Sequence, residues 1–505
     1  MTEVVSKGAG KLPTERKPKT AGVIPSPDNF RDKAKGKRFI LTCAQNNTKL
    51  HTGFWNNLLA LAKHRKAQIM VSAITYNKSG FQNATKGNEA ENEEQWFDER
   101  IAKYRRDDSI QIAPGLVFSA ELDILPTAKD PLSGLDNYTA TNSMVVPHTK
   151  VHMRSYAGLL SGQSQRFGYT TGAATLRNYI DRRAGQIASY HHVYGALYVE
   201  VDTDGRWFAR QINATDEGSF FELDEYVEGA KVYPASGDYV SERFASSPER
   251  VVNLGDIHAE KMDDQSFKVA MDFLERVRPT HVAIHDLLDF EARNHHNIKD
   301  PFFRAQQHFG GMDTVEANFK HAAVILGEIT RVSGAVPIVV RSNHDQAFDR
   351  WLREFDGKHD PANARFYHYH MFQRYAAIEY GEEYDSFWHA LCQAAYTQSI
   401  DNRTWINIRE DDSYVIHDIE FGLHGHLGPN GAKGSPKGYR QLGRKLNTGH
   451  THSASIIDGV WTAGVLASLR MGYNKGPSSW SVSHILTHPN GKRQMITQKG
   501  DKWHA

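Results

Sequence analysis

The sequence predicts an α/β protein with more than one domain, and two observations indicate this. The 505 residues exceed the roughly 100–200 residues of one typical domain. Strand-like apolar runs alternate with amphipathic helical patterns in two stretches, residues 39–71 and 250–340. A strand–helix–strand order is typical of parallel α/β units. We therefore expect one α/β domain in each half of the chain.

Residues 1–37 are expected to form a disordered basic tail. Residues 1–38 contain ten Lys and Arg against four Asp and Glu, together with four prolines and few large apolar side chains. Segments of this composition cannot bury enough apolar surface to fold. We interpret the tail as a solubilising leader, with a weak nucleic-acid tether as the alternative.

Residues 38–240 are expected to form an α/β N-terminal domain of unknown role. The predicted elements are strands at 39–44, 68–71 and 194–201 and an amphipathic helix at 54–64. No internal repeat, glycine-rich phosphate loop or catalytic constellation is recognisable in this half. The serine-containing stretch 236–247 marks the predicted domain boundary.

In residues 248–505, strands and helices alternate regularly. The predicted strands are 250–254, 281–284 and 336–340, and the predicted helices are 264–277 and 315–332. Each strand leads into polar residues at its carboxyl end, where the loops of open α/β sheets converge. Five polar groups follow in chain order: Gly255-Asp256-Ile257-His258, His285-Asp286-Leu287-Leu288-Asp289, Ser342-Asn343-His344-Asp345, Leu423-His424-Gly425-His426 and Gly449-His450-Thr451-His452.

The histidine distribution points to the same half. Of 26 His, 6 lie in residues 1–250 and 20 in residues 251–505, although the chain as a whole carries a formal charge of only +1. Neutral imidazole is the commonest metal ligand in proteins. Two cysteines, Cys43 and Cys392, are too few for a disulfide framework or a cysteine-based zinc site. We therefore expect a metal site built from imidazole and oxygen ligands.

Membrane and targeting segments are not expected. No apolar run approaches the roughly 18 residues of a membrane span, and the N-terminus lacks the apolar stretch of a signal peptide. The composition, with 40% hydrophobic and 24% charged residues, is typical of a globular protein. We expect a cytoplasmic protein without a membrane partner.

The five polar groups can together hold two metal ions. Side chains alternate along a strand, so the outer residues of Asp-x-His or His-x-His point to one side. The groups supply enough ligands for two octahedral or five-coordinate ions that share a carboxylate. Taken singly, each group has another interpretation, because a lone His-x-His more often packs than binds metal and Asn343 could cap a helix.

Together and in this order, the groups resemble the signature of the calcineurin-like metallophosphoesterase superfamily. That signature consists of Asp-x-His, Gly-Asp-x-x-Asp, Gly-Asn-His-Glu/Asp, a single His after a strand, and Gly-His-x-His. The resemblance covers about residues 249–470. It implies that residues 248–505 form a catalytic domain with a four-layer α-β-β-α sandwich. An aromatic-rich segment at about 360–400 interrupts the alternation and is predicted to be a helical insertion for packing or oligomerisation.

The resemblance implies seven metal ligands and two catalytic residues. The first ion would be held by Asp256, His258 and His452, and the second ion by Asn343, His424 and His450. Asp286 would bridge the two ions. The catalytic residues are His344, which matches the family's histidine beside the scissile phosphate, and Asp345, which matches its orienting carboxylate.

Some positions leave alternatives. His285 and Ser342 stand where the family usually has glycine, so His285 could add a contact of its own. We choose His424 as the ligand of its block because it directly follows a predicted strand, which leaves His426 as a substrate contact. We interpret Asp289 as a hydrogen-bond partner of a ligand rather than as a ligand.

The implied reaction is phosphoester hydrolysis. Two divalent ions about 3.5–4 Å apart lower the pKa of a bridging water and clamp phosphate oxygens. His344 would stabilise the transition state or protonate the leaving oxygen. Mixed oxygen and imidazole ligation without thiolates favours Mn²⁺, and the sequence leaves Mg²⁺, iron, Zn²⁺ and Ni²⁺ open.

The loop 428–445 predicts a nucleic-acid substrate. It carries five Lys and Arg and no acidic residue, and it is tied at both ends to predicted metal ligands. Such a loop can contact the phosphates that flank the scissile one. An ordinary solvated loop is the alternative. The predicted substrate contacts are His426, Lys433, Lys437, Arg440 and Arg444.

These features favour a DNA nuclease similar to the SbcD-type branch of the superfamily, although that branch carries its accessory region after the catalytic domain. The layout also resembles the pre-early DNA-transfer proteins of tailed phages, which are associated with host DNA breakdown and would act in the host cytoplasm. The alternatives are a phosphodiesterase for a small cyclic nucleotide, a phosphatase, and a nucleic-acid scaffold with structural metals. Homo-oligomerisation stays open.

Overall fold

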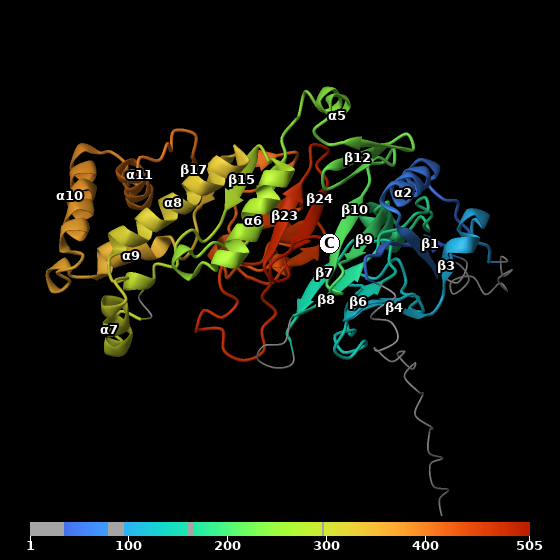
Figure 1. Ribbon diagram of the computed structural model, residues 1–505, viewed down its shortest axis with the longest axis horizontal. Coiled ribbons are helices and arrows are strands. Elements are labelled where there is room, and N and C mark those ends of the chain that lie inside the picture. Colours follow the sequence, from blue (N-terminus) through green and yellow to red (C-terminus); the bar gives the residue numbers. More distant parts are fainter. Residues whose placement is uncertain (1–34, 79–94, 159–164, 295–296) are drawn as a thin grey trace, which may run out of the picture.

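The computed structural model describes residues 35–78, 95–158, 165–294 and 297–505 of the chain. Most of the predicted disordered tail therefore lies outside the described residues. The described part is a mixed α/β structure, as the sequence predicts, and it contains four sheets. In Figure 1 the first half of the chain lies at one end of the long axis, and helices of the second half lie at the other.

The first half, which we define as residues 38–213, contains a five-stranded sheet of order β10-β9-β1-β2-β3. Strands β1, β2 and β3 are parallel, β9 and β10 are antiparallel, and helix α2 joins β1 to β2. The bounds are β1 Arg38–Gln45, α2 Thr52–Arg65, β2 Gln68–Ile74, β3 Arg105–Arg106, α4 Arg183–His191, β9 Gly195–Val201 and β10 Trp207–Asn213. The predicted strands and the predicted helix of this half are confirmed.

The second half, which we define as residues 250–505, contains a six-stranded sheet of order β17-β16-β15-β14-β23-β24. Its first four strands are parallel, and β23 and β24 are antiparallel. The bounds are β14 Val251–Asn253, α6 Asp264–Val277, β15 His281–Ile284, α8 Val315–Ser333, β16 Val336–Val340, β17 Ile406–Ile408, β23 Ser483–Thr487 and β24 Arg493–Thr497. The predicted alternation of strands and helices is confirmed here too.

A ten-stranded sheet takes strands from both halves, in the order β18-β19-β20-β22-β21-β7-β8-β6-β5-β4. The halves meet where β7 pairs with β21, at Met153 and Ile456. The bounds are β4 Ser109–Ala113, β5 Leu116–Ser119, β6 Ser143–Val146, β7 Met153–Tyr156, β8 Arg166–Thr170, β18 Val415–Ile416, β19 Ile419–Glu420, β20 Lys445–Thr448, β21 Ser455–Ile457 and β22 Val460–Thr462. Because the halves share a sheet, the predicted division into two domains stays a prediction.

Segments between and beyond these sheets complete the fold. A three-stranded sheet and α5 connect the halves, and the predicted boundary at 236–247 includes α5. Helices α10 and α11 form the predicted aromatic insertion at the far end of Figure 1. The bounds are β11 Phe220–Glu222, β12 Glu225–Glu228, β13 Lys231–Pro234, α5 Asp238–Arg243, α7 Pro301–Phe309, α9 Gln346–Glu354, α10 Ala364–Tyr380, α11 Ser386–Thr397 and α12 Pro436–Tyr439.

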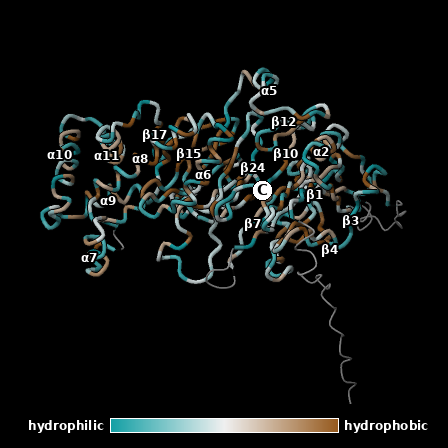
Figure 2. Tube along the Cα trace, viewed as in Figure 1, coloured by the Kyte–Doolittle hydropathy of each residue, from teal (hydrophilic) through white to brown (hydrophobic). Residues whose placement is uncertain are grey.

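The hydrophobic core lies between and around the sheets. One cluster joins side chains of all three large sheets, including Leu197, Ile456 and Ile485, and another packs α6, α8 and α11 together. Figure 2 shows hydrophobic stretches in the interior strands and hydrophilic loops around them. Among the described helices, none has both the length and the apolar character needed to cross a bilayer.

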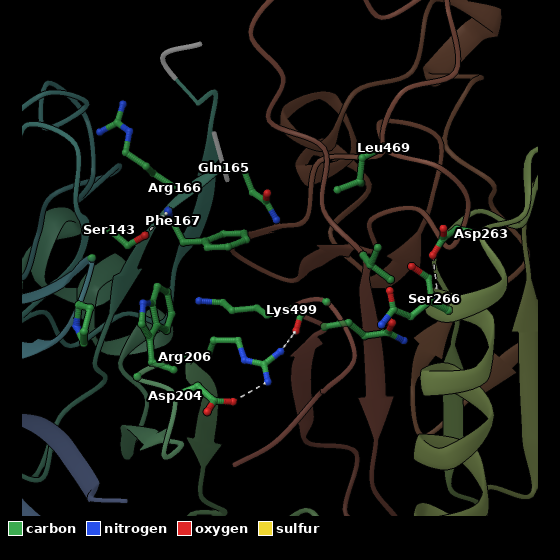
Figure 3. Close-up of a pocket in the computed structure, with 18 of the residues that line it drawn as sticks. Ser143, Gln165, Arg166, Phe167, Asp204, Arg206, Asp263, Ser266, Leu469 and Lys499 are labelled. Atoms are coloured by element: carbon green, nitrogen blue, oxygen red, sulfur yellow. Dashed lines mark hydrogen bonds and ion pairs between the residues drawn. The ribbon is translucent and has the colours of Figure 1, made fainter. Parts of the chain in front are cut away.

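A cavity of about 720 Å³ lies along the seam between the halves. In Figure 3, Arg166 and Phe167 of the first half lie on one side of the cavity, and Asp263 and Leu469 of the second half lie on the other. The side chain of Lys499, from the second half, reaches the first half, where its Nζ lies 3.0 Å from the centre of the Trp207 ring. Elsewhere the two halves pack against each other, and β10 of the first half contacts β24 of the second.

Candidate metal centre

The polar residues that follow the strands of the second half come together in one cluster. The carboxyl ends of parallel strands meet at one edge of a sheet, which explains this convergence. Among the described residues, three groups of Asp and His side chains have ligand atoms within 4.8 Å of one another, and all three lie here. The groups are Asp256, His258, Asp286 and His452; His258, Asp289 and His344; and Asp286, His424 and His450.

The first group directs its ligand atoms toward one point. The Nε2 atoms of His258 and His452 lie 3.0 Å apart. Nε2 of His452 lies 3.2 Å from Oδ2 of Asp256, and Nε2 of His258 lies 3.5 Å from Oδ2 of Asp286. Two imidazoles and two carboxylates could therefore hold one cation.

Asp286 also belongs to a second ligand group. Its Oδ2 atom lies 3.3 Å from Nε2 of His424, and the same nitrogen lies 3.2 Å from Oδ1 of Asn343. His450 completes this group. Asp286 thus lies between two sets of ligands, which is the position that a bridging carboxylate needs.

The donor atoms fit divalent cations. The Oδ1 atoms of Asp256 and Asp286 are buried and have no hydrogen-bond partner among the described residues. Burying unpartnered carboxylate oxygens is unfavourable, and a bound cation would remove that penalty. Oxygen and imidazole donors suit Mn²⁺ and related ions, whereas the ligand set alone does not identify the metal. These buried Asp and His groups could hold metal ions.

Electrostatic interactions within the cluster keep its carboxylates charged. Burial alone would raise the pKa of Asp286, but the neighbouring imidazoles lower that pKa well below its usual value. Burial alone would lower the pKa of His452, but Asp256 and Asp286 raise it to about 9. Burial and the nearby His424 lower the pKa of His450 to about 4. At neutral pH the carboxylates are therefore ready to bind a cation.

Four of the candidate ligands have a left-handed backbone. The φ angles of His258, Asp286, His450 and His452 are 44°, 45°, 74° and 56°. Residues other than glycine rarely adopt this region, because the Cβ atom then approaches the backbone closely. Such strain persists where the surrounding structure holds a residue in place, and it is concentrated at functional sites.

Two glycines allow the strand ends to approach one another. A Cβ atom at Gly449 would lie 2.0 Å from Oδ1 of Asp256, and one at Gly255 would lie 2.7 Å from the backbone of Val465. The next residue after Gly449, His450, donates its backbone N–H to Oδ2 of Asp256 at 2.7 Å. The glycines therefore permit the contacts that fix Asp256.

His344 lies at the edge of the cluster, where its partner is Asp289. Nδ1 of His344 lies 3.3 Å from the backbone oxygen of Asp289 and 3.5 Å from its Oδ1 atom. The same Oδ1 atom lies 3.1 Å from Nδ1 of His258, whose other nitrogen faces the first ligand group. Asp289 thus has the hydrogen-bonding position that we expected, and it orients two histidines.

Asp345 has partners other than the expected one. It accepts hydrogen bonds from the backbone N–H groups of Leu288 and Ser342, at 3.1 and 3.2 Å, and from the Ser342 hydroxyl at 2.8 Å. Burial, together with the charge of Asp286, raises the pKa of Asp345 to about 6. Asp345 therefore ties the loops after β15 and β16 together, and Asp289 supplies the contact to His344.

The two remaining histidines of the motifs point to other partners. Nε2 of His285 lies 3.0 Å from Oδ1 of Asn253 on β14. Nε2 of His426 lies 3.3 Å from the amide nitrogen of Gln346, and its ring lies 5.3 Å from that of His424. Within their block, His424 joins the ligand group and His426 lies beside it.

The basic loop 428–445 begins next to the cluster. The backbone N–H of Gly434 donates to the oxygen of His426 at 2.8 Å, and Lys433 pairs with Leu427 across the start of the loop. Both contacts hold the first part of the loop beside the metal-ligand groups. Lys433 is exposed there.

The later part of the loop lines a groove of about 920 Å³ that both halves enclose. Arg440 lies 2.9 Å from Asp458, and Arg444 lies 3.5 Å from Glu420, which are pairings that the sequence did not predict. Tyr190 of the first half lies at the groove and is 82% exposed. The Lys and Arg residues that line this basic groove are Lys129, Lys437, Arg440, Arg444 and Lys445.

Two further residues near the cluster lie outside the five sequence motifs. The ring of Trp480 lies edge-on to that of His452, with centroids 4.3 Å apart. Glu260 is partly buried and accepts the backbone N–H of Asp289 at 2.7 Å, and desolvation with the charge of Asp289 raises its pKa to about 7. Only its place two residues after His258 could have marked Glu260 in the sequence.

Comparison with known proteins gives the chain its family. No family model matches the chain. The chain is similar to protein A1 of Escherichia phage T5, with 38% identity over 513 residues that cover 99% of this chain and 88% of the relative. Similarity of this extent includes both halves and supports a phage origin. The chain therefore belongs to the family of protein A1 of Escherichia phage T5.

Proposed function

We propose that the chain is a phosphodiester hydrolase that uses two divalent ions, with DNA as its substrate. The observation that carries this proposal is the shared carboxylate of Asp286, which contributes to two buried ligand groups. Enzymes that hydrolyse phosphodiesters commonly use two metal ions held close together. Mn²⁺ is the proposed ion because of the oxygen and imidazole donors.

Each ligand group would hold one ion. Asp286 would contribute to both sites, and the other ligands would be Asp256, His258 and His452 for the first ion and Asn343, His424 and His450 for the second. When bound, the two ions supply positive charge to the phosphate and lower the pKa of water. The chain itself orients the ligands, through contacts such as that of Asp289 with His258.

His344 is the proposed proton donor. Burial alone would lower its pKa, but the carboxylates of Asp286 and Asp289 raise it. Its side chain is 20% exposed, so a substrate can reach it. A protonated imidazole at the edge of the ligand groups is suited to protonate the leaving oxygen.

The basic groove supports nucleic acid as the substrate. Five Lys and Arg line it against two acids, Asp418 and Asp458, and exposed Tyr190 offers a ring for stacking. Phosphate backbones bind such cationic surfaces, and bases stack on aromatic rings. Membership of a phage family supports action in the cytoplasm of the host cell. Homo-oligomerisation stays a prediction, and the exposed aromatic residues Phe372 and Tyr375 of α10 are its candidate contacts.

A substrate panel tests this proposal. The protein is incubated with Mn²⁺ and with linear, circular or single-stranded DNA, in parallel with a cyclic nucleotide and with p-nitrophenyl phosphodiesters and monoesters. We expect cleavage of DNA that stops when EDTA is added. Turnover of the small esters alone would favour the small-nucleotide phosphodiesterase or the phosphatase. Metal binding without any turnover would favour a scaffold with structural metals.

A further inference from the structure

The two large sheets outside the shared one follow the same plan. Read from the edge strand, β10-β9-β1-β2-β3 in the first half corresponds to β24-β23-β14-β15-β16 in the second, with the same parallel and antiparallel pairings. In each half a helix of 14 residues, α2 or α6, joins the first two strands in sequence. Both helices end at a residue with a left-handed backbone, Lys66 or Arg278.

The ten-stranded sheet repeats the plan on either side of its centre. Outward from the centre, β7-β8-β6-β5-β4 corresponds to β21-β22-β20-β19-β18. On both sides the successive pairings are antiparallel, parallel, parallel and antiparallel. The equivalent strands β7 and β21 pair antiparallel with each other at Met153 and Ile456. A two-fold axis between two copies would produce this arrangement.

Backbone hydrogen bonds show which residues of the two halves are equivalent. Two bonds recur at equivalent places. In the first half, the N–H of Ala174 donates to the oxygen of Cys43 at 2.8 Å, and that of Leu176 donates to the oxygen of Lys49 at 2.9 Å. In the second half, the N–H of Leu466 donates to the oxygen of Asp256 at 2.7 Å, and that of Ser468 donates to the oxygen of Lys261 at 2.9 Å. Cys43 therefore occupies the position of the metal ligand Asp256. The connections that follow the equivalent strands β6 and β20 give a second correspondence. Six residues join β6 to β7, and six join β20 to β21, so that His148 occupies the position of His450.

We infer that residues 38–213, the first copy, repeat the fold of residues 250–505, the second copy, which carries the metal centre, and that the first copy has lost the metal site. The first copy lacks four of the five ligands that the register aligns. The corresponding residues of the first copy are Cys43, Gln45, Ser72, His148 and Lys150, in the order of Asp256, His258, Asp286, His450 and His452. The inference rests on the proposed function for the metal content of the second copy.

Hydrogen bonds within the first copy occupy the side chains at three of the five corresponding positions. The Cys43 thiol donates to the oxygen of Gly172 at 3.2 Å, and the Ser72 hydroxyl donates to the oxygen of Ala120 at 2.8 Å. Nδ1 of His148 accepts the N–H of Lys150 at 3.0 Å, and its Nε2 lies 3.2 Å from the oxygen of Leu125. Both ring nitrogens of His148 are thus occupied, whereas Asp256 and Asp286 each keep a buried oxygen without a partner.

The backbone of the first copy is relaxed at the same positions. None of the five corresponding residues has a positive φ angle, although four of the metal-centre residues do. At these positions the strain is therefore not a requirement of the fold, and it occurs only in the copy that carries the candidate ligands.

Lys150, which occupies the position of His452, makes contacts of a different kind. Its ammonium group donates to the backbone oxygen of Lys129 at 3.1 Å and lies 3.0 Å from a carboxylate oxygen of Asp458 in the other copy. Both side chains of this ion pair are largely buried, at 7% and 13% exposure. A position that holds a metal ligand in the second copy thus connects the two copies in the first.

Metal counting in the intact chain tests the inference. The protein is equilibrated with Mn²⁺, freed of unbound metal by gel filtration and analysed by inductively coupled plasma mass spectrometry. The variants are Asp286→Ala in the second copy and Gln45→Ala with His148→Gln in the first. Two ions in the wild type and in the first-copy variant, with none in Asp286→Ala, support the inference. Metal retained in full by Asp286→Ala, or lost from a folded first-copy variant, would overturn it; Gln45→Ala alone replaces the double variant if that one does not fold.

Cd²⁺ provides a measurement that does not depend on the proposed function. In a Cys392→Ser background, Cys43 is the single remaining thiol of the chain. We expect no thiolate–Cd²⁺ charge-transfer absorption, because the Cys43 site is closed. An absorption band that disappears on Cys43→Ser refutes the metal-free first copy. A wild-type chain that binds no Mn²⁺ refutes the proposed function instead, and the Cd²⁺ titration still decides the inference.

Discussion

Asp289 contacts His344 twice, through its backbone oxygen at 3.3 Å and its carboxylate at 3.5 Å from Nδ1. The same carboxylate lies 3.1 Å from His258, so one side chain links a metal-ligand group to the proposed proton donor. Replacing His344 should therefore separate chemistry from metal binding.

His344→Ala should retain Mn²⁺ and lose about 10²–10⁴-fold in the rate of DNA cleavage, the usual contribution of a general acid. Metal analysis and single-turnover kinetics measure the two effects. Asp289→Asn is the companion variant, and it should shift the pH–rate profile because it removes a negative charge near the imidazole. Wild-type cleavage by His344→Ala would remove this residue from the mechanism.

Gly449→Ala should weaken metal binding by about 10–100-fold, the usual effect of disturbing the surroundings of a ligand. The added methyl group would lie 2.0 Å from Oδ1 of Asp256 and must displace that carboxylate. The matched control is Gly459→Ala, because the nearest atom to its methyl group lies at an ordinary 3.5 Å. Isothermal titration with Mn²⁺ compares the two, and equal affinities would contradict the proposed role of Asp256.

Mn²⁺ affinity should rise with pH between about pH 6 and pH 9. Without metal, Asp256 and Asp286 raise the pKa of His452 to about 9, so this imidazole is protonated at pH 7. A metal ligand must be deprotonated, and metal binding therefore displaces a proton. Raising the pH removes that competition until the pKa is passed. Titrations in buffers of different ionisation enthalpy measure the released proton, and its absence would count against His452 as a ligand.

Charge reversal in the basic groove should weaken DNA binding in a salt-dependent way. In the double variant Lys437→Glu/Arg444→Glu, the slope of log affinity against log salt should fall by roughly one for each lost phosphate contact. The control is Lys268→Glu, because Lys268 is an exposed residue of α6 that does not line the groove. Fluorescence anisotropy at several salt concentrations gives the slopes. An unchanged slope would show that the groove does not hold the DNA backbone.

Arg210 should be required for stability but not for chemistry. It is buried on β10, and its guanidinium lies 2.6 Å from both Glu200 and Glu222. Removing one partner from a buried ionic network typically costs about 3–5 kcal/mol, because the remaining charges lose their compensation. Arg210→Ala should therefore lower the urea midpoint strongly, whereas exposed Arg403→Ala should not. Similar midpoints for both variants would contradict this.

Local patterns were sufficient to predict β14, β15, β16, α6 and α8 of the second half and the Asp and His residues that come together in its cluster. Apolar strands that lead into Asp256, Asp286 and His450 carry a signal that periodicity and motif spacing make visible. The partner of His344 could not be predicted, because Asp289 reaches it through the backbone and through a loop geometry that short motifs do not encode. The pairings of Arg440 and Arg444 with acids were hidden because Asp458 and Glu420 lie in other segments.

The repeated fold was also hidden from the sequence. Positions such as Cys43, Gln45 and Ser72 have lost the polar signature by which the second copy was recognised, and the short stretch His148-Thr149 is too small to reveal a repeat. The copies agree in strand order and hydrogen bonding, which apolar residues of many kinds can satisfy. Divergence removed the chemistry of the first copy and left its architecture.

The pairing of β7 with β21 has a consequence for how the molecule assembles. In a homodimer, a sheet shared by two subunits forms only after two chains meet, so its stability depends on protein concentration. Here both contributing segments belong to one polypeptide, and the shared sheet forms in a unimolecular step. The first molecules synthesised in a cell can thus complete this sheet at any dilution, without waiting for a partner.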